Sequence, residues 1–173
     1  MPGNLYEPIK KKEDERMEKY RKESEQTFDT FCGLLDHIGW KYRADRNSLW
    51  ISTGASGEDL PMEIILRFNP AIGRFFLMSQ MPVTMKEEKR IDAALVVNEF
   101  NKDKKLGAFD LDFESGRIFF KVTQCFVGCR VSEELCSFLL QFSLKFIDDY
   151  NDKFLMLNNG LISTEQFLAA VKS

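Results

Sequence analysis

Residues 96–120 constrain the fold of this chain more than any other segment, because they have the pattern of a helix end, a glycine-bearing turn and a β-hairpin. Ser115-Gly116 supplies a two-residue turn, and the residues on either side of it alternate between apolar and polar. A slip of one residue would place the carboxylates of the hairpin in the core. The alternation therefore predicts which face of each strand is buried, and a hairpin next to a helix indicates a fold that mixes helices with a sheet.

The same turn predicts which residues face one another across the hairpin. On the buried face the expected pairs are Phe113 with Ile118, Leu111 with Phe120, and Phe109 with Val122. On the opposite face they are Glu114 with Arg117, Asp112 with Phe119, and Asp110 with Lys121. Opposite charges paired across two strands contribute about 0.2–1 kcal/mol each, which favours this register. Phe119 is the unusual member of the second face, because its neighbours there are charged.

Apolar residues spaced three and four apart predict helices, and alternation predicts strands. Helices are expected at residues 13–38, 84–102 and 132–158, followed by a short one from Ser163. Strands are expected at residues 49–53, 61–68 and 74–81, in addition to the hairpin, and Pro82 is expected to end the third. The predicted fold class is α+β: an antiparallel sheet of about five strands flanked by helices, in the order α-β-β-β-α-β-β-α, with an added short C-terminal helix.

Capping residues refine the expected helix ends. A glycine in the left-handed conformation commonly ends a helix, and a Ser or Thr followed three residues later by Glu or Gln commonly begins one. The expected caps are Gly39 after the first helix, Thr84 with Glu87 before the second, Ser132 before the third, and Ser163 with Gln166 before the last. In the second helix, the stripe expected to face the core consists of Ile91, Ala94, Leu95 and Asn98.

Length and composition indicate one domain. The chain has 173 residues, of which 44% are hydrophobic, and this length can bury a sizeable core without disulfides. It contains 16 Phe, so some aromatic side chains are available to face a partner. Residues 13–173 are expected to form a single α+β domain, and residues 1–12, which include Pro2, Gly3 and Pro8, a loose N-terminal segment.

Charge and hydropathy exclude two classes of partner. A nucleic-acid binder normally carries a basic field, whereas the net charge here is −3 and the basic run Lys10-Lys11-Lys12 is followed at once by three acidic residues. No apolar run reaches the roughly 18 residues of a membrane span, and the first residues lack the apolar region of a secretory signal. Four cysteines without paired spacing fit a reducing compartment. We therefore expect a cytoplasmic protein that binds neither nucleic acid nor membrane.

Two residue types could carry chemistry. His37 is the single histidine, and we interpret it as a residue at a helix end rather than as a catalytic base. Cys125 and Cys129 are separated by three residues, with Cys136 further on and Cys32 distant in sequence. Zinc sites use four thiolate or imidazole ligands in tight pairs, so we interpret all four cysteines as small buried hydrophobic residues. A redox role for Cys125 and Cys129 stays open.

Two acidic or loop patterns resemble cation sites. Asp110, Asp112 and Glu114 follow one face of a strand, which is more typical of a polar strand face than of a divalent-cation site. The segment around Gly160 resembles the second half of an EF-hand loop, but leucines stand where calcium requires carboxylates. We therefore expect no enzymatic activity, no catalytic residue, no metal and no cofactor.

Several residues of the central segment also occur together in a known family. They are Asn98, Asn101, Leu106-Gly107, Phe109-Asp110-Leu111-Asp112 and Gly116-Arg117-Ile118. With these residues the chain resembles the YbjN-type domain family of bacteria, which is structurally similar to the type III secretion chaperones. The resemblance implies an antiparallel sheet flanked by helices, frequent dimerisation and no established catalytic residues. The charged N-terminal extension and the helix after Gly160 depart from the family pattern.

These observations favour a protein-interaction module of the chaperone-like or regulatory kind, which binds another protein or itself. The expected contact residues are Phe76, Met78 and Phe119, because they are apolar residues on the outer faces of their strands. We expect a homodimer, together with a protein or peptide partner of unknown identity. The alternative is a small-ligand sensor or an unrecognised enzyme, with a pocket between the sheet and the long helix.

Overall fold

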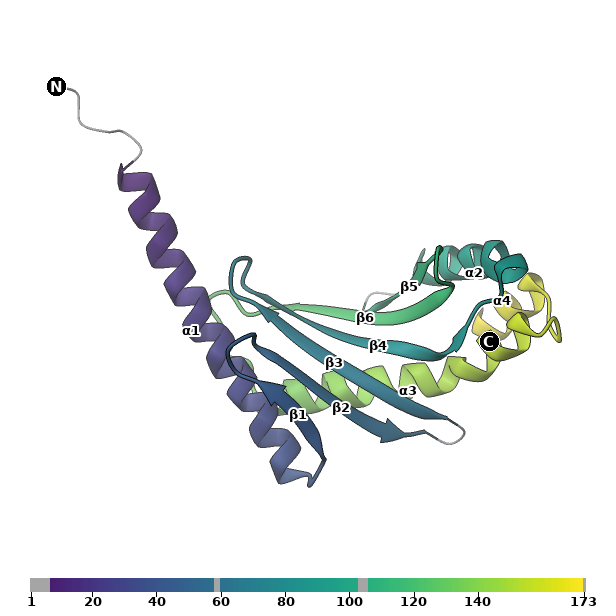
Figure 1. The fold of residues 1–173 in the computed structure, drawn as a ribbon, viewed down its shortest axis with the longest axis horizontal. Coiled ribbons are helices and arrows are strands. Elements are labelled where there is room, and N and C mark those ends of the chain that lie inside the picture. The colour runs from purple at the N-terminus through teal and green to yellow at the C-terminus, as the bar shows by residue number, and fades with distance from the viewer. Residues whose placement is uncertain (1–6, 58–59, 103–105, 173) are drawn as a thin grey trace.

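The computed structural model describes residues 7–57, 60–102 and 106–172 (Figure 1). Within these residues the chain forms one six-stranded antiparallel sheet flanked by four α-helices, which confirms the predicted α+β class. The strands are β1 (Tyr42–Asp45), β2 (Trp50–Ser56), β3 (Pro61–Asn69), β4 (Arg74–Thr84), β5 (Ala108–Asp112) and β6 (Arg117–Cys125). The helices are α1 (Glu7–His37), α2 (Arg90–Lys102), α3 (Glu133–Asn158) and α4 (Thr164–Lys172), and a 3-10 turn, η1 (Glu87–Lys89), precedes α2.

All the helices that pack on the sheet cover the same face of it. The strand order is β1-β2-β3-β4-β6-β5, with α1 against β2 and β3 and with α3 against β4 and β6. The covered face, which we call the inner face, holds fully buried residues such as Ile51, Leu66 and Leu77. Figure 1 shows α2 and α4 stacked together near the C-terminal end of α3.

Aromatic rings fill the space between β5, β6 and the helices. Phe109 of β5 and Phe120 of β6 lie with their ring centroids 5.3 Å apart. Phe146 of α3 stacks on Phe120 at 5.0 Å, and Phe100 of α2 lies 4.8 Å from Phe109. Such ring pairs add about 0.5–1.5 kcal/mol each beyond the burial of their area. A large part of the phenylalanine excess therefore belongs to the core.

The first helix is longer than expected. It begins at Glu7 rather than at residue 13, and its first half projects beyond the sheet (Figure 1). Ion pairs one helical turn apart, such as Glu18 with Lys22, support this projecting part. The other end is as predicted: Gly39 has a positive φ of 71°, and the Trp40 N–H donates to the Leu35 carbonyl at 2.9 Å.

The sequence pattern missed strand β1. Its four residues, Tyr42–Asp45, pair with the start of β2, so that Tyr42 lies opposite Thr53 and Asp45 opposite Trp50. None of the four side chains is fully buried, and therefore no apolar alternation marks the strand. The expected sheet of about five strands is thus close to the observed six.

The hairpin between β5 and β6 has the predicted faces but a different register. Leu111 pairs with Ile118 and Phe109 with Phe120, so the expected pairs are wrong by two positions. A shift of two residues leaves every side chain on its predicted face, because strand side chains alternate with a period of two. The expected pair of Phe113 with Ile118 fails most clearly, since Phe113 is 54% exposed in the loop.

The Asp112 carboxylate explains the longer loop. It accepts hydrogen bonds from the backbone N–H of Glu114 and of Ser115, and from the Ser115 hydroxyl at 2.7 Å. These bonds close an Asx turn that competes with the two-residue turn. The Gly116 N–H then donates to the Asp112 carbonyl at 2.8 Å, with Gly116 at a φ of 75°. The expected pair of Glu114 with Arg117 is therefore wrong, because Arg117 lies opposite Asp112.

Strand β4 continues past Pro82, which was expected to end it. The pairing with β6 is irregular between Gln80 and Thr84, and Pro82 lies in this interruption. Proline has no N–H to contribute to the ladder and is tolerated at such irregular positions. Pro82 therefore occupies a bulge in β4 instead of ending the strand.

The Thr84–Glu87 capping box is also wrong. Thr84 is the last residue of β4, and the cap position before η1 belongs to Lys86, whose side chain makes no capping bond. The carboxamide of Asn158 in α3 satisfies these backbone groups instead. It accepts from the Lys86 N–H at 2.8 Å and donates to the Thr84 carbonyl at 3.1 Å. A contact across more than seventy residues of sequence thus replaces the local cap.

The face of α2 that packs on the core was predicted incorrectly. Ile91 and Leu95 are 66% and 53% exposed, whereas the buried residues are Ala93, Val96, Val97 and Phe100. Both sets have helical spacing, so the local sequence supports either face. The contact of Phe100 with the aromatic cluster orients the helix, and that contact cannot be read from local sequence.

The caps of the last two helices are confirmed. Ser132 accepts from the Leu135 N–H at the start of α3. Ser163 and Gln166 form the expected capping box before α4: the Gln166 N–H donates to the Ser163 hydroxyl at 3.2 Å, and the Ser163 N–H donates to the Gln166 side chain at 2.8 Å. Among the described helices, none combines the length and the apolar character that crossing a membrane requires.

The carboxamide of Asn101 covers part of the edge strand β5. It donates to the Phe109 carbonyl at 2.8 Å and accepts from the Phe109 N–H at 3.0 Å. These are the two bonds that a residue of a neighbouring strand would make, so the side chain takes the place of a seventh strand at this position. Gly107, which precedes β5 with a φ of 77°, passes so close to Phe120 that a β-carbon would lie 2.4 Å from the ring.

Candidate functional site

The side of the sheet opposite α1 and α3 carries a group of large apolar residues, and we call this side the open face. Neighbouring strands align these residues in rows: Trp50 lies opposite Arg67, which lies opposite Phe76, and Ile65 lies opposite Met78. All of the apolar members are half-buried. The apolar residues of the open face are Trp50, Ile65, Phe76, Met78 and Phe119.

The three expected contact residues all lie on this face. Phe76 and Met78 are on β4, and Phe119 is on β6 opposite Gln80, one diagonal step from Met78. The Lys121 ammonium lies 5.8 Å from the centroid of the Phe119 ring and also pairs with Asp110. The expected association of Asp110 with Lys121 is thus present as an ion pair, although Lys121 lies directly opposite Ala108.

Trp50 and Ile65 were not among the expected contact residues. Ile65 lies between Ile64 and Leu66 in β3, and both of these neighbours point into the core. Trp50 is the first residue of β2, where a strand boundary hides the alternation. Extending the alternation of β3 to Ile65 would have identified it, because side chains i and i+2 of a strand share a face.

Two adjoining hollows extend the apolar group toward β1. The first has a volume of about 270 Å³ and is lined by Arg43, Trp50, Ser52, Glu63, Ile65 and Arg67. The second, of about 320 Å³, is lined by Lys41, Tyr42, Arg43, Ser52, Thr53, Gly54 and Glu63. The two share Arg43, Ser52 and Glu63, and we call the combined depression the arginine trough. Within it, the Ser52 hydroxyl donates to the Glu63 carboxylate at 3.1 Å.

Tyr42 of β1 carries a hydroxyl and not a phenolate, and this hydroxyl lies near Asp36 and Cys32 of α1, on the helix-covered side of the sheet. Loss of hydration, together with the nearby Asp36 and Cys32 side chains, raises the pKa of Tyr42 to about 12. The side chain is therefore protonated at neutral pH and can donate or accept a hydrogen bond.

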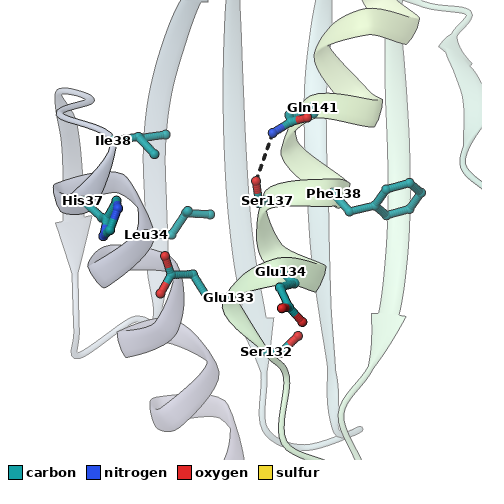
Figure 2. Close-up of a pocket in the computed structure, with 9 residues that line it drawn as sticks. All are labelled: Leu34, His37, Ile38, Ser132, Glu133, Glu134, Ser137, Phe138 and Gln141. Atoms are coloured by element: carbon teal, nitrogen blue, oxygen red, sulfur yellow. Dashed lines mark hydrogen bonds between the residues drawn. The ribbon is translucent and has the colours of Figure 1, made fainter.

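A larger groove lies between the end of α1 and the start of α3, with a volume of about 910 Å³ (Figure 2). Leu34 and Ile38 of α1 face it, whereas Phe138 points away to the other side of α3. Ser137 accepts a hydrogen bond from the Gln141 carboxamide at 3.0 Å. The exposed His37 also lines the groove, but among the described residues it makes no hydrogen bond to either serine of the groove, as a catalytic base would require.

The cysteines differ from one another in exposure. Cys136 is fully buried, and burial raises the pKa of its thiol to about 12. Cys125 and Cys129 are exposed, so their interpretation as buried hydrophobic residues is wrong. The Cys129 sulfur lies 3.9 Å from the Cys125 carbonyl oxygen, which places both residues in one turn. Within the described ranges, no three His, Cys, Asp or Glu residues are grouped so that they could hold a metal ion.

The acidic residues of the hairpin are occupied by local partners. Asp110 pairs with Lys121, and Asp112 holds the turn. The Ser115 hydroxyl and backbone N–H hold the pKa of the Asp112 carboxyl below its usual range. These carboxylates therefore support the hairpin, as their interpretation as a polar strand face predicts.

Comparison with known proteins adds no family to this description. No protein-family model matches the chain, and no curated protein matches it. The resemblance to the YbjN-type domain therefore stays a prediction, which rests on the residues of the central segment. Two of these residues now have a structural role: Asn101 covers the edge of β5, and Gly107 allows close packing on Phe120.

Proposed function

We propose that this chain is a non-enzymatic protein-interaction module, chaperone-like or regulatory, whose open face binds a segment of another protein. The observation that carries the proposal is the group of five large apolar residues on a sheet face that none of the described helices covers. Apolar side chains gain nothing from contact with water, and large exposed groups of them commonly mark interaction sites. Aromatic residues such as Trp50 and Phe119 are also common among the residues that dominate binding energy.

A second copy of the chain is the other occupant considered for this face. A homodimer is expected from the sequence, and a two-fold axis is the commonest way to pair identical surfaces. The open face also carries Arg43, Arg67 and Arg74, and a two-fold contact centred on them would bring like charges together. This repulsion favours a different protein as the main partner of the arginine-bearing part of the face.

The small-ligand sensor or unrecognised enzyme has less support. Its pocket was expected between the sheet and the long helix, where Phe120 now stacks on Phe146. The groove of Figure 2 lies elsewhere, between α1 and α3, and two of its polar residues, Ser137 and Gln141, bond to each other. Ligand sites usually combine an apolar cleft with a few convergent polar groups, and the expected position between the sheet and the long helix offers packed aromatic rings instead.

The proposed cytoplasmic location is supported by the thiols. Cys125 and Cys129 are exposed and free. Exposed free thiols in one turn persist most readily in a reducing compartment. The absence of a basic field in a chain with a net charge of −3 supports the proposal that nucleic acid is not a partner.

The test substitutes one residue of the open face and compares capture of partners from the native host. Phe119→Asp places a charge in the apolar group, and we expect it to abolish capture of the proteins that the unchanged chain retains. Ile91→Asp is the matched control, because Ile91 is an exposed apolar residue of α2. Equal capture by both variants, measured by quantitative mass spectrometry, would contradict the proposal.

Light scattering at micromolar concentration distinguishes a second copy of the chain from a different protein as the occupant of the open face. A mass near twice 20.1 kDa that falls to one chain in Phe119→Asp would assign the open face to a homodimer. A mass of one chain in both proteins would contradict the homodimer expected from the sequence and would leave the face available for a different partner. Circular dichroism of the variant provides the check on folding, since loss of structure would place Phe119 in the core.

A further inference from the structure

We infer that the partner segment bound by the open face is acidic, with carboxylates that contact Arg43 and Arg67 and an apolar side chain that packs beside Trp50 and Ile65. This inference rests on the proposed function, because it specifies the chemistry of the segment that the open face binds. It follows from the charges of the arginine trough, the bonding state of its arginines and the apolar residues in its wall.

The charge of the trough is the first argument. Its lining includes three cationic side chains, Lys41, Arg43 and Arg67, and a single carboxylate, Glu63. The chain as a whole has a net charge of −3, so this local excess of positive charge runs against its overall balance. A surface of one sign attracts partners of the other sign and excludes partners of the same sign.

The bonding state of the arginines is the second argument. Some other cationic side chains of the described surface have acidic partners: Arg46 pairs with Asp29, and Lys121 with Asp110. Arg43 and Arg67 are exposed, and in the described residues neither guanidinium has an ion pair or a hydrogen bond. Asp45 is the other carboxylate near Trp50, and it is held in its own turn by Ser48 and Asn47.

The geometry of a guanidinium suits a carboxylate. Its planar fork of N–H groups binds both oxygens of one carboxylate at once, and it stacks on aromatic rings. Arg67 lies directly opposite Trp50 on the neighbouring strand, with Ile65 one alternation away on the same face. A segment in which acidic and apolar residues alternate would place a carboxylate on the arginines and an apolar side chain between Trp50 and Ile65.

The apolar wall of the trough favours a protein segment over other anions. A nucleic-acid surface needs many cations that follow a phosphate backbone, and here three cations border a trough with Trp50 and Ile65 in its wall. An anionic membrane would contact a broad flat surface, whereas the trough is a local depression of a twisted sheet.

The test selects random peptides displayed on phage against the immobilised full-length chain. We expect the selected peptides to be rich in Asp and Glu next to aromatic or aliphatic residues. A charge-reversed protein, Arg43→Glu with Arg67→Glu, is expected to select peptides rich in Lys and Arg. The matched control is Lys12→Glu with Arg16→Glu on the projecting part of α1, which makes the same change of charge at exposed positions far from the sheet and is expected to select acidic peptides as before.

The selected acidic peptide is then synthesised and titrated in solution. We expect the charge-reversed protein to bind it at least about tenfold more weakly, because each lost charge contact leaves the other partner unpaired. Thermal melts check that both arginine substitutions leave the fold intact. Labelled double-stranded DNA and phosphatidylserine vesicles are titrated in parallel, and saturable binding of either that depends on Arg43 and Arg67 would overturn the inference.

The outcomes separate this inference from the proposed function. Neutral apolar peptides that are lost on Phe119→Asp but retained on charge reversal would overturn the acidic partner and keep the open face as a binding surface. Acidic peptides that bind the charge-reversed protein equally well would also overturn it. Failure to enrich any peptide, together with equal protein capture by Phe119→Asp and Ile91→Asp, would overturn both.

Discussion

The two faces of the sheet are built from the same strands and differ in what covers them. In β3, β4 and β6 every second residue points to the inner face, where Ile64, Leu77 and Phe120 are completely buried beneath helices. Several of the residues between them, among which are Ile65, Met78 and Phe119, are also apolar, yet none of the described helices packs on them. The inner face is explained by stability alone. The apolar character of the open face is expected to contribute less to stability, and it is the observation on which the proposed interaction rests.

The two faces are expected to differ most in how much the free energy of unfolding falls when an aromatic side chain is truncated to alanine. Phe120→Ala removes a ring that packs against Phe109 and Phe146, and we expect it to lower the free energy of unfolding by about 3–5 kcal/mol. Phe119→Ala, one residue away on the open face, is expected to cost less than about 1 kcal/mol. Urea unfolding of both variants measures the difference. Equal costs would mean that the open face is covered in the folded chain.

The turn of the β5–β6 hairpin offers a second test with a smaller expected effect. A change in this turn affects both faces, because the turn sets how β5 and β6 pair. In Gly116→Val, the side chain must adopt a φ of 75°, and its β-carbon would lie 2.3 Å from the Met85 carbonyl oxygen. We expect a loss of about 1–3 kcal/mol, as is typical of strained backbone positions. Glu114→Val is the control, since Glu114 is an exposed residue of the same turn and is not one of the positive-φ residues of the chain. An unchanged thermal melt for Gly116→Val would contradict the observed turn.

Substitution of Asn101 tests how strand β5, at the edge of the sheet, is protected. Asn101→Ala removes two hydrogen bonds to the Phe109 backbone, and we expect it to cost about 1–2 kcal/mol. It should also promote association at high concentration, because it frees an edge strand. Asn98→Ala, at an exposed position of the same helix, is the control. Static light scattering against concentration distinguishes an opened edge from simple destabilisation.

The reactivity of the cysteines allows exposed and buried positions to be compared in the unchanged chain. Cys125 and Cys129 are exposed, whereas Cys136 is buried with its pKa raised to about 12. At neutral pH we expect N-ethylmaleimide to modify Cys125 and Cys129 rapidly, and Cys136 only after unfolding. Intact-mass spectra followed over time, with peptide mapping, identify the order of modification. Rapid labelling of Cys136 in the folded chain would contradict its position in the core.

The smallest expected effect concerns pH. The pKa of Asp112 is lowered in the folded chain, so its contribution to stability is present above the unfolded pKa and is lost as the pH falls through the folded value. Asp112→Asn keeps much of the turn geometry and removes the titration. We therefore expect the variant to lose less stability between pH 6 and about pH 3 than the unchanged chain. Parallel changes in the two proteins would contradict this role of Asp112.

Elements defined by nearby residues were predictable from the sequence. The Ser132 cap, the Ser163–Gln166 box and the Gly39 end each depend on groups within a few residues of one another, and all three are confirmed. The faces of the hairpin were also predictable, because alternation has a period of two. Its register was not, since the Asp112 carboxylate stabilises a longer loop than the Ser115-Gly116 pattern indicates.

Features that depend on distant contacts were not predictable. The start of α2 depends on Asn158, and the buried face of α2 depends on where Phe100 meets the aromatic cluster. The arginine trough has the same origin: Arg43 and Arg67 belong to strands that are not neighbours in the sheet, and the first of these strands was not predicted. Of the candidate site, the sequence therefore predicted Phe76, Met78 and Phe119 but not the arginine trough.

The carboxamide of Asn101 has a consequence for how copies of this chain can assemble. A copy that paired its β1 edge with the β5 edge of its neighbour would leave a further free edge, and growth would continue head to tail into a filament. At β5 the Phe109 backbone is already bonded, and at the other edge β1 offers only four residues. Contact between two open faces, by contrast, buries both of them, so no open face remains exposed for a further copy. Assemblies of this chain should therefore be small, closed and of fixed stoichiometry.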